Sequence, residues 1–200
     1  MALREISDAP IAAASLAQVY KATTTNNATV AVKVRRPGVL AEIALDLHIL
    51  RLLTPLQVRV SNAINKVATA PEDVATALAL VDEWGRGFVN EVDYAAEARN
   101  TKAFGAAMAA RGLGAVVAPR VIDALQTENV IVTEWIDGTR LDAAASPDVP
   151  RLCGVAINAY LTMLLDTGTL HCDPHPGNLL RTPSGKLCIL DWGLVTSIDL

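Results

Sequence analysis

The chain has 200 residues, a formal net charge of −4 and 52% hydrophobic residues, of which few are aromatic. Its 17 basic and 21 acidic residues are mixed without a basic stripe, which argues against nucleic-acid binding. No apolar run reaches about 18 residues, so we expect no transmembrane helix, and the charged residues 1–5 do not resemble a secretory signal. The three cysteines, Cys153, Cys172 and Cys188, fit neither a zinc site nor a disulfide framework, which suits a reducing compartment.

Two strands are predicted near the start, over residues 16–21 and 29–35. The polar residues between them, with Asn26 and Asn27, favour a hairpin turn. Side chains alternate along a strand, so the valines of residues 29–35 point to one face and Lys33 to the other.

Helices are predicted next. The first covers residues 39–53 and ends near Pro55, because the residue before a proline disfavours the helical region. A longer helical stretch begins at residue 71, continues to about residue 110, and has Gly85 and Gly87 as points where it bends or breaks. Within this stretch Glu97 follows Asp93 by four positions, so the two acids share a neighbouring helical face.

The second half begins with strands predicted over residues 116–125 and 129–135, followed by a turn at 137–138. A second apolar helix is predicted over 152–165, closed by Gly168. Apolar runs at 179–181 and 187–190 flank turn residues and predict another hairpin. The order of elements is typical of an α+β fold and not of a regular alternation of strand and helix.

Three polar residues around this last hairpin carry the chemistry. Asp173 is followed by Asn178 and, after the hairpin, by Asp191. The hairpin would return Asn178 and Asp191 to the same end, as a shared metal site requires. Phosphoryl transfer uses such a set, with one carboxylate near the attacking group and further oxygen ligands holding magnesium on the phosphates.

Four blocks of sequence together resemble the UbiB/ADCK-type atypical kinases, a protein-kinase-like family linked to coenzyme Q and other isoprenoid quinones. The blocks are residues 10–20 with their alanine-rich loop, 30–34 around Lys33, 91–100 with Glu91, Asp93 and Glu97, and 171–178 with the later Asp191-Trp192-Gly193. The resemblance implies a protein-kinase-like fold, with an N-lobe antiparallel sheet and long helices and the start of a mainly helical C-lobe. We expect one kinase-like domain over 1–200, with an N-lobe and helical insert over 10–136 and a partial C-lobe over 137–200.

The resemblance also implies roles for individual residues. Lys33 would contact the α- and β-phosphates of ATP and pair with Glu97, and Asp173 would be the catalytic base or orient the acceptor. Asn178 and Asp191 would bind Mg²⁺. The expected nucleotide-binding residues are Ala12, Ala13, Ala14, Ser15, Gln18, Glu91, Asp93, Lys33, and Glu134 with Ile136 as the hinge that binds adenine.

The alanine loop has a consequence for nucleotide binding. Glycine would let backbone N–H groups approach phosphates closely, and Ala12, Ala13 and Ala14 allow this less freely. We therefore expect unusual nucleotide selectivity and weak activity toward protein substrates.

The sequence departs from the family pattern at both ends. The family's Lys-x-Gly-Gln motif does not occur before Ala12, and only seven residues follow Gly193. We expect the chain to be a fragment with a truncated C-lobe, whose missing helices would leave apolar surface exposed.

The expected function is an ATP- and Mg²⁺-binding kinase-like domain, acting as an ATPase or on a small or lipid-related molecule, in support of isoprenoid (ubiquinone) biosynthesis. The resemblance implies an isoprenoid lipid or quinone precursor, a biosynthetic complex and a membrane surface as partners, with mitochondrion, plastid and bacterium open as locations. One alternative is a small-molecule phosphotransferase of the aminoglycoside or choline kinase type. Another is a non-catalytic nucleotide-dependent scaffold.

A further alternative is metal-dependent hydrolysis through His171, Asp173 and His175, which alternate along the chain. The prolines between them favour a loop over a strand, so we expect structural roles for both histidines.

Overall fold

The computed structural model describes residues 1–143 and 146–198. The chain forms two compact units, one made of Met1–Arg35 with Asp93–Leu200 and the other of Arg36–Val92. The first unit carries nearly every predicted site residue. The second is a helical hairpin that interrupts the first in sequence.

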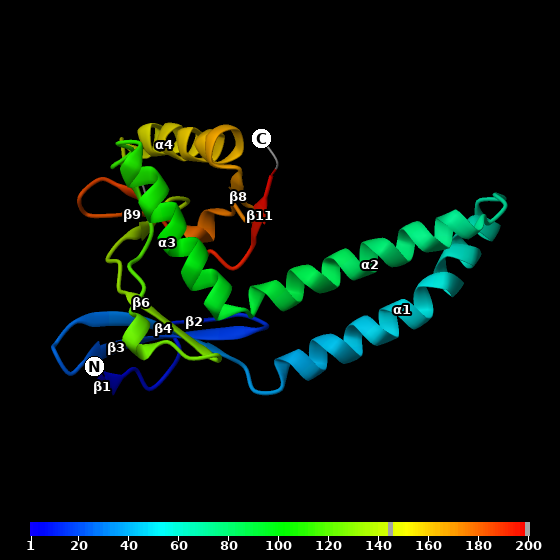
Figure 1. The fold of residues 1–200 in the computed structure, drawn as a ribbon, viewed down its shortest axis with the longest axis horizontal. Helices are drawn as coiled ribbons and strands as arrows, with labels where there is room; N and C mark the ends of the chain where they lie inside the picture. Colours follow the sequence, from blue (N-terminus) through cyan, green and yellow to red (C-terminus); the bar gives the residue numbers. More distant parts are fainter. Residues whose placement is uncertain (144–145, 199–200) are drawn as a thin grey trace. The chain divides into compact units, whose positions relative to one another are not determined.

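The first unit contains an antiparallel sheet, seen in blue and green in Figure 1. Its strands run in the order β1 (Leu3–Ile6), β3 (Ala17–Thr24), β4 (Thr29–Arg35) and β6 (Val130–Glu134), and β2 (Ala12–Ala13) pairs with β3. The predicted β3–β4 hairpin is confirmed, with Asn27 at φ 61° in its turn. The strand β1 is not anticipated from sequence.

The two faces of β4 differ as the alternation predicts. Val30 and Val32 are buried and pack with Ala22, Ile122 and Val132. Lys33 points to the opposite face, where a cleft lies. The strand thus places a lysine over the cleft because its apolar neighbours are held in the core on the other side.

The rest of the first unit is mixed helix and strand. Its helices are α3 (Tyr94–Ala110), α4 (Val149–Thr162), a π-helical turn (Met163–Thr167), and two 3-10 turns, η1 (Asp123–Leu125) and η3 (Pro176–Asn178). Its strands are β5 (Val116–Val117), β7 (Thr139–Arg140), β8 (Thr169–His171), β9 (Leu179–Arg181), β10 (Leu187–Ile189) and β11 (Val195–Ser197). A core of buried residues joins α3, α4 and these strands, and its largest members are Phe104, Met108, Leu152, Met163, Leu187, Ile189 and Trp192.

Several sequence predictions for this unit hold and one does not. The β9–β10 hairpin is present, with Gly185 at φ 74° in its turn, and Gly168 closes the helical segment at φ 64°. The strand predicted over 116–125 is wrong beyond its start. Only Val116–Val117 is a strand, because the chain then turns through Pro119 and forms η1.

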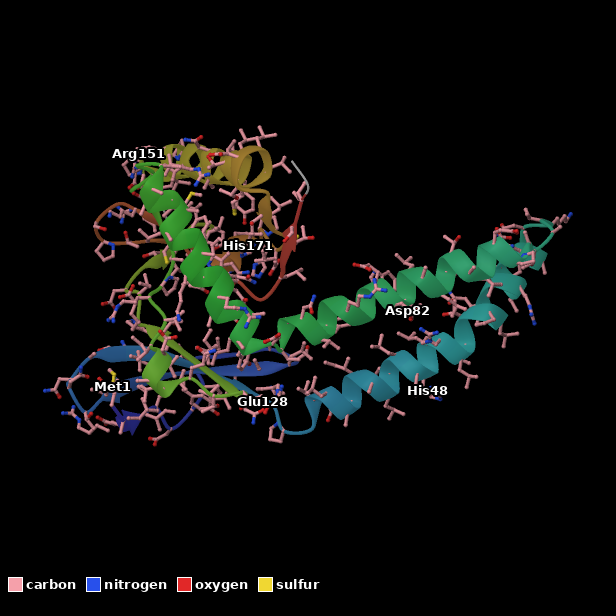
Figure 2. All side chains as sticks on the ribbon, viewed as in Figure 1. Met1, His48, Asp82, Glu128, Arg151 and His171 are labelled. Atoms are coloured by element: carbon pink, nitrogen blue, oxygen red, sulfur yellow. The ribbon has the colours of Figure 1, made fainter. Side chains whose placement is uncertain are left out.

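The hairpin unit consists of α1 (Val39–Ile64) and α2 (Pro71–Glu91) (Figure 2, where His48 and Asp82 are labelled). The predicted end of the first helix near Pro55 is wrong, since α1 continues nine residues beyond it, to Ile64. Packing of α1 on α2 outweighs the lost backbone hydrogen bond, and Thr54 donates its hydroxyl to the Leu50 carbonyl (2.7 Å).

The glycines of α2 do not break it. The helix passes through Gly85 and Gly87 and ends at Glu91. Gly85 is buried against Leu47 of α1, where a Cβ atom would lie 2.8 Å from Leu47 Cδ1, so the glycine allows the two helices to approach. Across residues 1–143 and 146–198, every helix is too short or too polar to cross a membrane.

Candidate nucleotide and metal site

Lys33 lies at the centre of the candidate site. Its Nζ is 2.9 Å from Glu97 Oε2 and 2.8 Å from Asp191 Oδ2. Burial by itself lowers the pKa of Lys33, but the two carboxylates outweigh burial and raise it above its ordinary value. Lys33 is therefore a fixed cation held between strand β4, helix α3 and the segment after β10.

The position of Glu97 depends on where α3 begins. The long helical stretch predicted from residue 71 ends at Glu91, and a new helix begins at Tyr94. Asp93 caps this helix, because its side chain accepts a hydrogen bond from the Ala96 N–H (2.9 Å). Glu97 then lies in the first turn of α3, where it is buried.

The start of α3 changes the expectation for the acids around it. Asp93 caps the helix from outside it, so the prediction that Asp93 and Glu97 share one helical face is wrong. Glu91 ends α2 in the other unit. Asp93 is not among the described residues that line the cleft beside Lys33.

His171 braces the loop that carries Asp173. Its Nε2–H donates to the carbonyl of Asp191, and its Nδ1 accepts from the Asp173 N–H (3.1 Å). Burial lowers the pKa of His171, so the ring is held neutral. Both nitrogens contact backbone groups, which agrees with the structural role expected for this histidine.

Asn178 and Asp173 contact each other directly. The Asn178 amide nitrogen donates to Asp173 Oδ2 over 2.9 Å. Since the nitrogen is committed to Asp173, the amide oxygen is the atom left for a cation. Asp191 Oδ1 accepts a hydrogen bond from the Gly193 N–H (3.0 Å). Burial alone would raise the pKa of Asp191, but the neighbouring Lys33 outweighs burial and lowers this pKa, which keeps the carboxylate charged.

These donors fit magnesium, which prefers oxygen ligands and commonly takes one or two from protein and the rest from phosphates and water. The part of the chain that the structure describes contains no group of three or more His, Cys, Asp or Glu side chains that could hold a metal ion by themselves. A cation held by Asn178 and Asp191 would therefore take the rest of its shell from water or from the phosphates of a bound ligand.

Trp192 connects the loop to helix α3. Its ring lies 4.1 Å from the Phe104 ring and 4.8 Å from the His171 ring, centroid to centroid, and its Nε1–H donates to the Ile189 carbonyl (3.0 Å). His171 is labelled in Figure 2. From α3, Asn100 Nδ2 donates to the Trp192 carbonyl (3.1 Å). The sequence analysis missed these contacts, and the only local signal for them is the large aromatic residue directly after Asp191.

The cleft beside Lys33 has a volume of about 520 Å³, within the range of small-ligand sites. Apolar side chains cover both sides of it, and those of the sheet alternate with core residues along their strands. The apolar lining includes Ile11, Val19, Ala31, Ile131, Leu180 and Leu190, and the polar lining includes Lys33, Glu97, Asn178 and Asp191. The cleft is therefore lined by both apolar and charged side chains, which suits a flat ring that bears phosphates.

The predicted hinge borders the cleft, with Glu134, Trp135 and Ile136 among its lining residues. The Glu134 N–H donates to the Arg120 carbonyl (2.8 Å), and the Trp135 N–H donates to the Thr29 carbonyl (3.1 Å). Lys21 Nζ lies 4.4 Å from the centre of the Trp135 ring. These contacts fix the backbone of the segment at one edge of the cleft.

The alanine loop is only partly in the cleft. Ala12 lines it, while Ala13 pairs with Gln18 across β2 and β3. The Ala14 N–H donates to the Ala17 carbonyl (2.9 Å), which turns the chain through Ser15 and into β3. The loop thus adopts a short hairpin at the edge of the cleft.

The comparisons with known proteins agree with this geometry. The model of the ABC1 atypical kinase-like domain matches residues 1–200. The chain belongs to this family. It is 40% identical over 198 residues to an uncharacterised aarF domain-containing protein kinase of Arabidopsis thaliana, and 38% identical to Protein ACTIVITY OF BC1 COMPLEX KINASE 3 of the same plant, both named chloroplastic. These matches cover 96% of this chain and 26% of each relative, so the chain spans about a quarter of their length.

Solved structures show the same fold. The complex of Rv3197 with erythromycin from Mycobacterium tuberculosis matches with a TM-score of 0.70 and 28% identity, over 98% of this chain and 47% of that one. The Rio2 kinase–ADP/Mg²⁺–phosphoaspartate complex from Chaetomium thermophilum matches with a TM-score of 0.56 and 14% identity, over 99% and 50%. This ABC1 domain therefore has a kinase-like α+β fold, as expected.

Proposed function

We propose that this ABC1 domain binds ATP with Mg²⁺ and transfers or hydrolyses the γ-phosphoryl group, acting on a small or lipid-related molecule in support of isoprenoid quinone biosynthesis. The observation that carries the proposal is the position of Lys33 between Glu97 and Asp191, at 2.9 and 2.8 Å. Phosphoryl transfer depends on positioning and charge neutralisation, and this arrangement supplies both.

Each residue then has a defined task. Lys33 contacts the α- and β-phosphates, and Glu97 keeps the lysine in place. Asn178 and Asp191 would hold Mg²⁺, which would supply positive charge beside the phosphates. Asp173 orients the attacking hydroxyl or water and accepts its proton. The ADP and Mg²⁺ present in the Rio2 complex support the choice of ligand.

The setting is proposed from the relatives. Names of the two Arabidopsis proteins include the word chloroplastic, and further relatives come from Synechocystis, at 35% and 36% identity. These matches favour a plastid or bacterial location over a mitochondrial one. Association with a membrane surface and a quinone precursor is proposed from the family's link to quinones.

Calorimetric titration of ATP and ADP, with and without Mg²⁺, tests binding, and phosphate release with and without lipid vesicles tests turnover. We expect Lys33→Met to abolish nucleotide binding and Asp173→Asn to keep binding but lose turnover. Lys186→Met changes an exposed lysine in the β9–β10 turn and is the matched control. Unchanged ATP affinity in Lys33→Met would overturn the proposal. Binding without turnover under all conditions would support a nucleotide-dependent scaffold instead.

A further inference from the structure

The loop between His171 and Asn178 contains a second histidine with a specific geometry. His175 Nδ1 accepts a hydrogen bond from the Gly177 N–H over 2.9 Å. The ring lies directly over Gly177, since a Cβ atom there would come 2.4 Å from His175 Cε1. Gly177 therefore leaves room for the ring, and its N–H fixes which ring nitrogen is the acceptor.

A neutral imidazole has one donor and one acceptor nitrogen. Because Nδ1 is the acceptor, the proton is on Nε2. That nitrogen faces Asp173 Oδ2 at 3.5 Å. The same oxygen accepts the Asn178 amide at 2.9 Å. One carboxylate oxygen thus accepts a hydrogen bond from Asn178 and has the Nε2 of His175 as a close neighbour.

From this we infer that His175 is a positioning residue, which holds the Asp173 carboxylate through its Nε2–H and leaves Oδ1 for the acceptor. The inference rests on the proposed phosphoryl-transfer function. The 3.5 Å separation is longer than a hydrogen bond, and catalytic contacts of this kind shorten when substrate is bound. The role is distinct from that of His171, whose nitrogens are both used by backbone groups.

Two substitutions separate the two ring nitrogens. In His175→Asn the amide oxygen takes the place of Nδ1 and can still accept from Gly177, but nothing reaches Asp173. In His175→Gln the terminal amide nitrogen extends to the position of Nε2 and can donate to Asp173. His48→Gln changes an exposed histidine on α1 and serves as the matched control.

Phosphate release from Mg·ATP is measured for the full 200-residue chain and each variant. We expect kcat in His175→Asn to fall about 10- to 100-fold, the range for a hydrogen bond to a charged group, and His175→Gln to recover most of it. The KM for Mg·ATP should stay within about twofold, because His175 contacts Asp173 and not the nucleotide. The inference would be overturned if His175→Asn kept its activity while His175→Gln lost it, or if the activity of both variants were unchanged.

A second measurement does not depend on turnover. Nitrogen-15 spectra of the histidine rings at pH 8 report which nitrogen carries the proton, and loss of signals in His175→Asn assigns them. We expect the Nε2–H form, with an Nε2 shift that changes in Asp173→Asn. A proton on Nδ1, or no response to Asp173→Asn, would overturn the inference even if wild-type protein hydrolyses ATP. If Lys33→Met binds ATP normally, the proposed function fails and these ring spectra still decide the contact.

Discussion

The rings of Phe104 and Trp192 lie 4.1 Å apart, and this contact joins helix α3, which carries Glu97, to the segment that carries Asp191. Both carboxylates hold Lys33. The packing of two buried aromatic side chains therefore connects the two elements whose carboxylates hold Lys33.

Phe104→Ala tests this relationship. Removal of a buried phenylalanine leaves a cavity beneath Trp192, and we expect a loss of about 3–5 kcal/mol in unfolding free energy together with weaker Mg·ATP binding. Urea denaturation and calorimetry measure the two effects. The control is Phe88→Ala, the only other phenylalanine of the sequence, which is half-exposed on α2 and should cost less than about 1 kcal/mol. Equal losses for the two variants would contradict the prediction.

The two glycines of α2 provide a second test. Gly85→Ala places a methyl group 2.8 Å from Leu47 Cδ1, so the Leu47 side chain must shift, and we expect this cost to offset most of the gain in helix propensity of about 1 kcal/mol. In Gly87→Ala a Cβ atom has no neighbour within 4 Å, so the change should stabilise the helix by about 0.5–1 kcal/mol. Thermal unfolding of both proteins compares the two effects, and a gain in Gly85→Ala equal to or larger than that in Gly87→Ala would refute the packing argument.

Stability should depend on pH through His171. Burial lowers its pKa in the folded state below the ordinary value of 6.5. Below pH 6.5 the unfolded chain binds a proton at this histidine more readily than the folded chain does, which favours unfolding. The stabilising contribution of the neutral, buried His171 is therefore fully present above pH 6.5. It is lost as the pH falls toward the folded-state pKa, by up to about 1.4 kcal/mol per pH unit.

His171→Gln should therefore lower stability at pH 7.5 and flatten the decline of stability as the pH falls below 6.5. Urea midpoints at several pH values measure this slope. His48→Gln, at an exposed position, shows what the loss of a surface histidine does. An identical slope in His171→Gln and wild type would count against the assignment.

The alanine loop gives a prediction for nucleotide choice. Ala13 is held in β2 by its pairing with Gln18. Ala13→Gly would free the backbone to approach phosphates more closely, so we expect the ratio of ATP to ADP affinity to change. Calorimetric titration of both nucleotides measures the ratio. Unchanged affinities for both would show that the alanine does not set nucleotide selectivity.

Local patterns predict much of the fold and part of the site. The valine alternation correctly points Lys33 away from the core, and the turn chemistry of residues 182–186 returns Asp191 toward Asn178, because both signals come from neighbours in sequence. The end of one helix and the start of the next around Asp93 cannot be predicted from the sequence, because apolar residues continue at helical spacing on both sides. A single capping carboxylate, that of Asp93, starts the new helix. The pairing of Phe104 with Trp192 joins residues far apart in sequence, which no local pattern reports.

The same helix boundary has an evolutionary consequence. Strand β4 ends at Arg35 and α3 starts at Tyr94, and each is held within the first unit by its own contacts. We therefore expect Lys33 and Glu97 to keep their separation when the length of the segment between them changes. Insertions and deletions within Arg36–Val92 can accumulate in a lineage without disturbing the charge centre, so this hairpin is where we expect members of the family to diverge most in length.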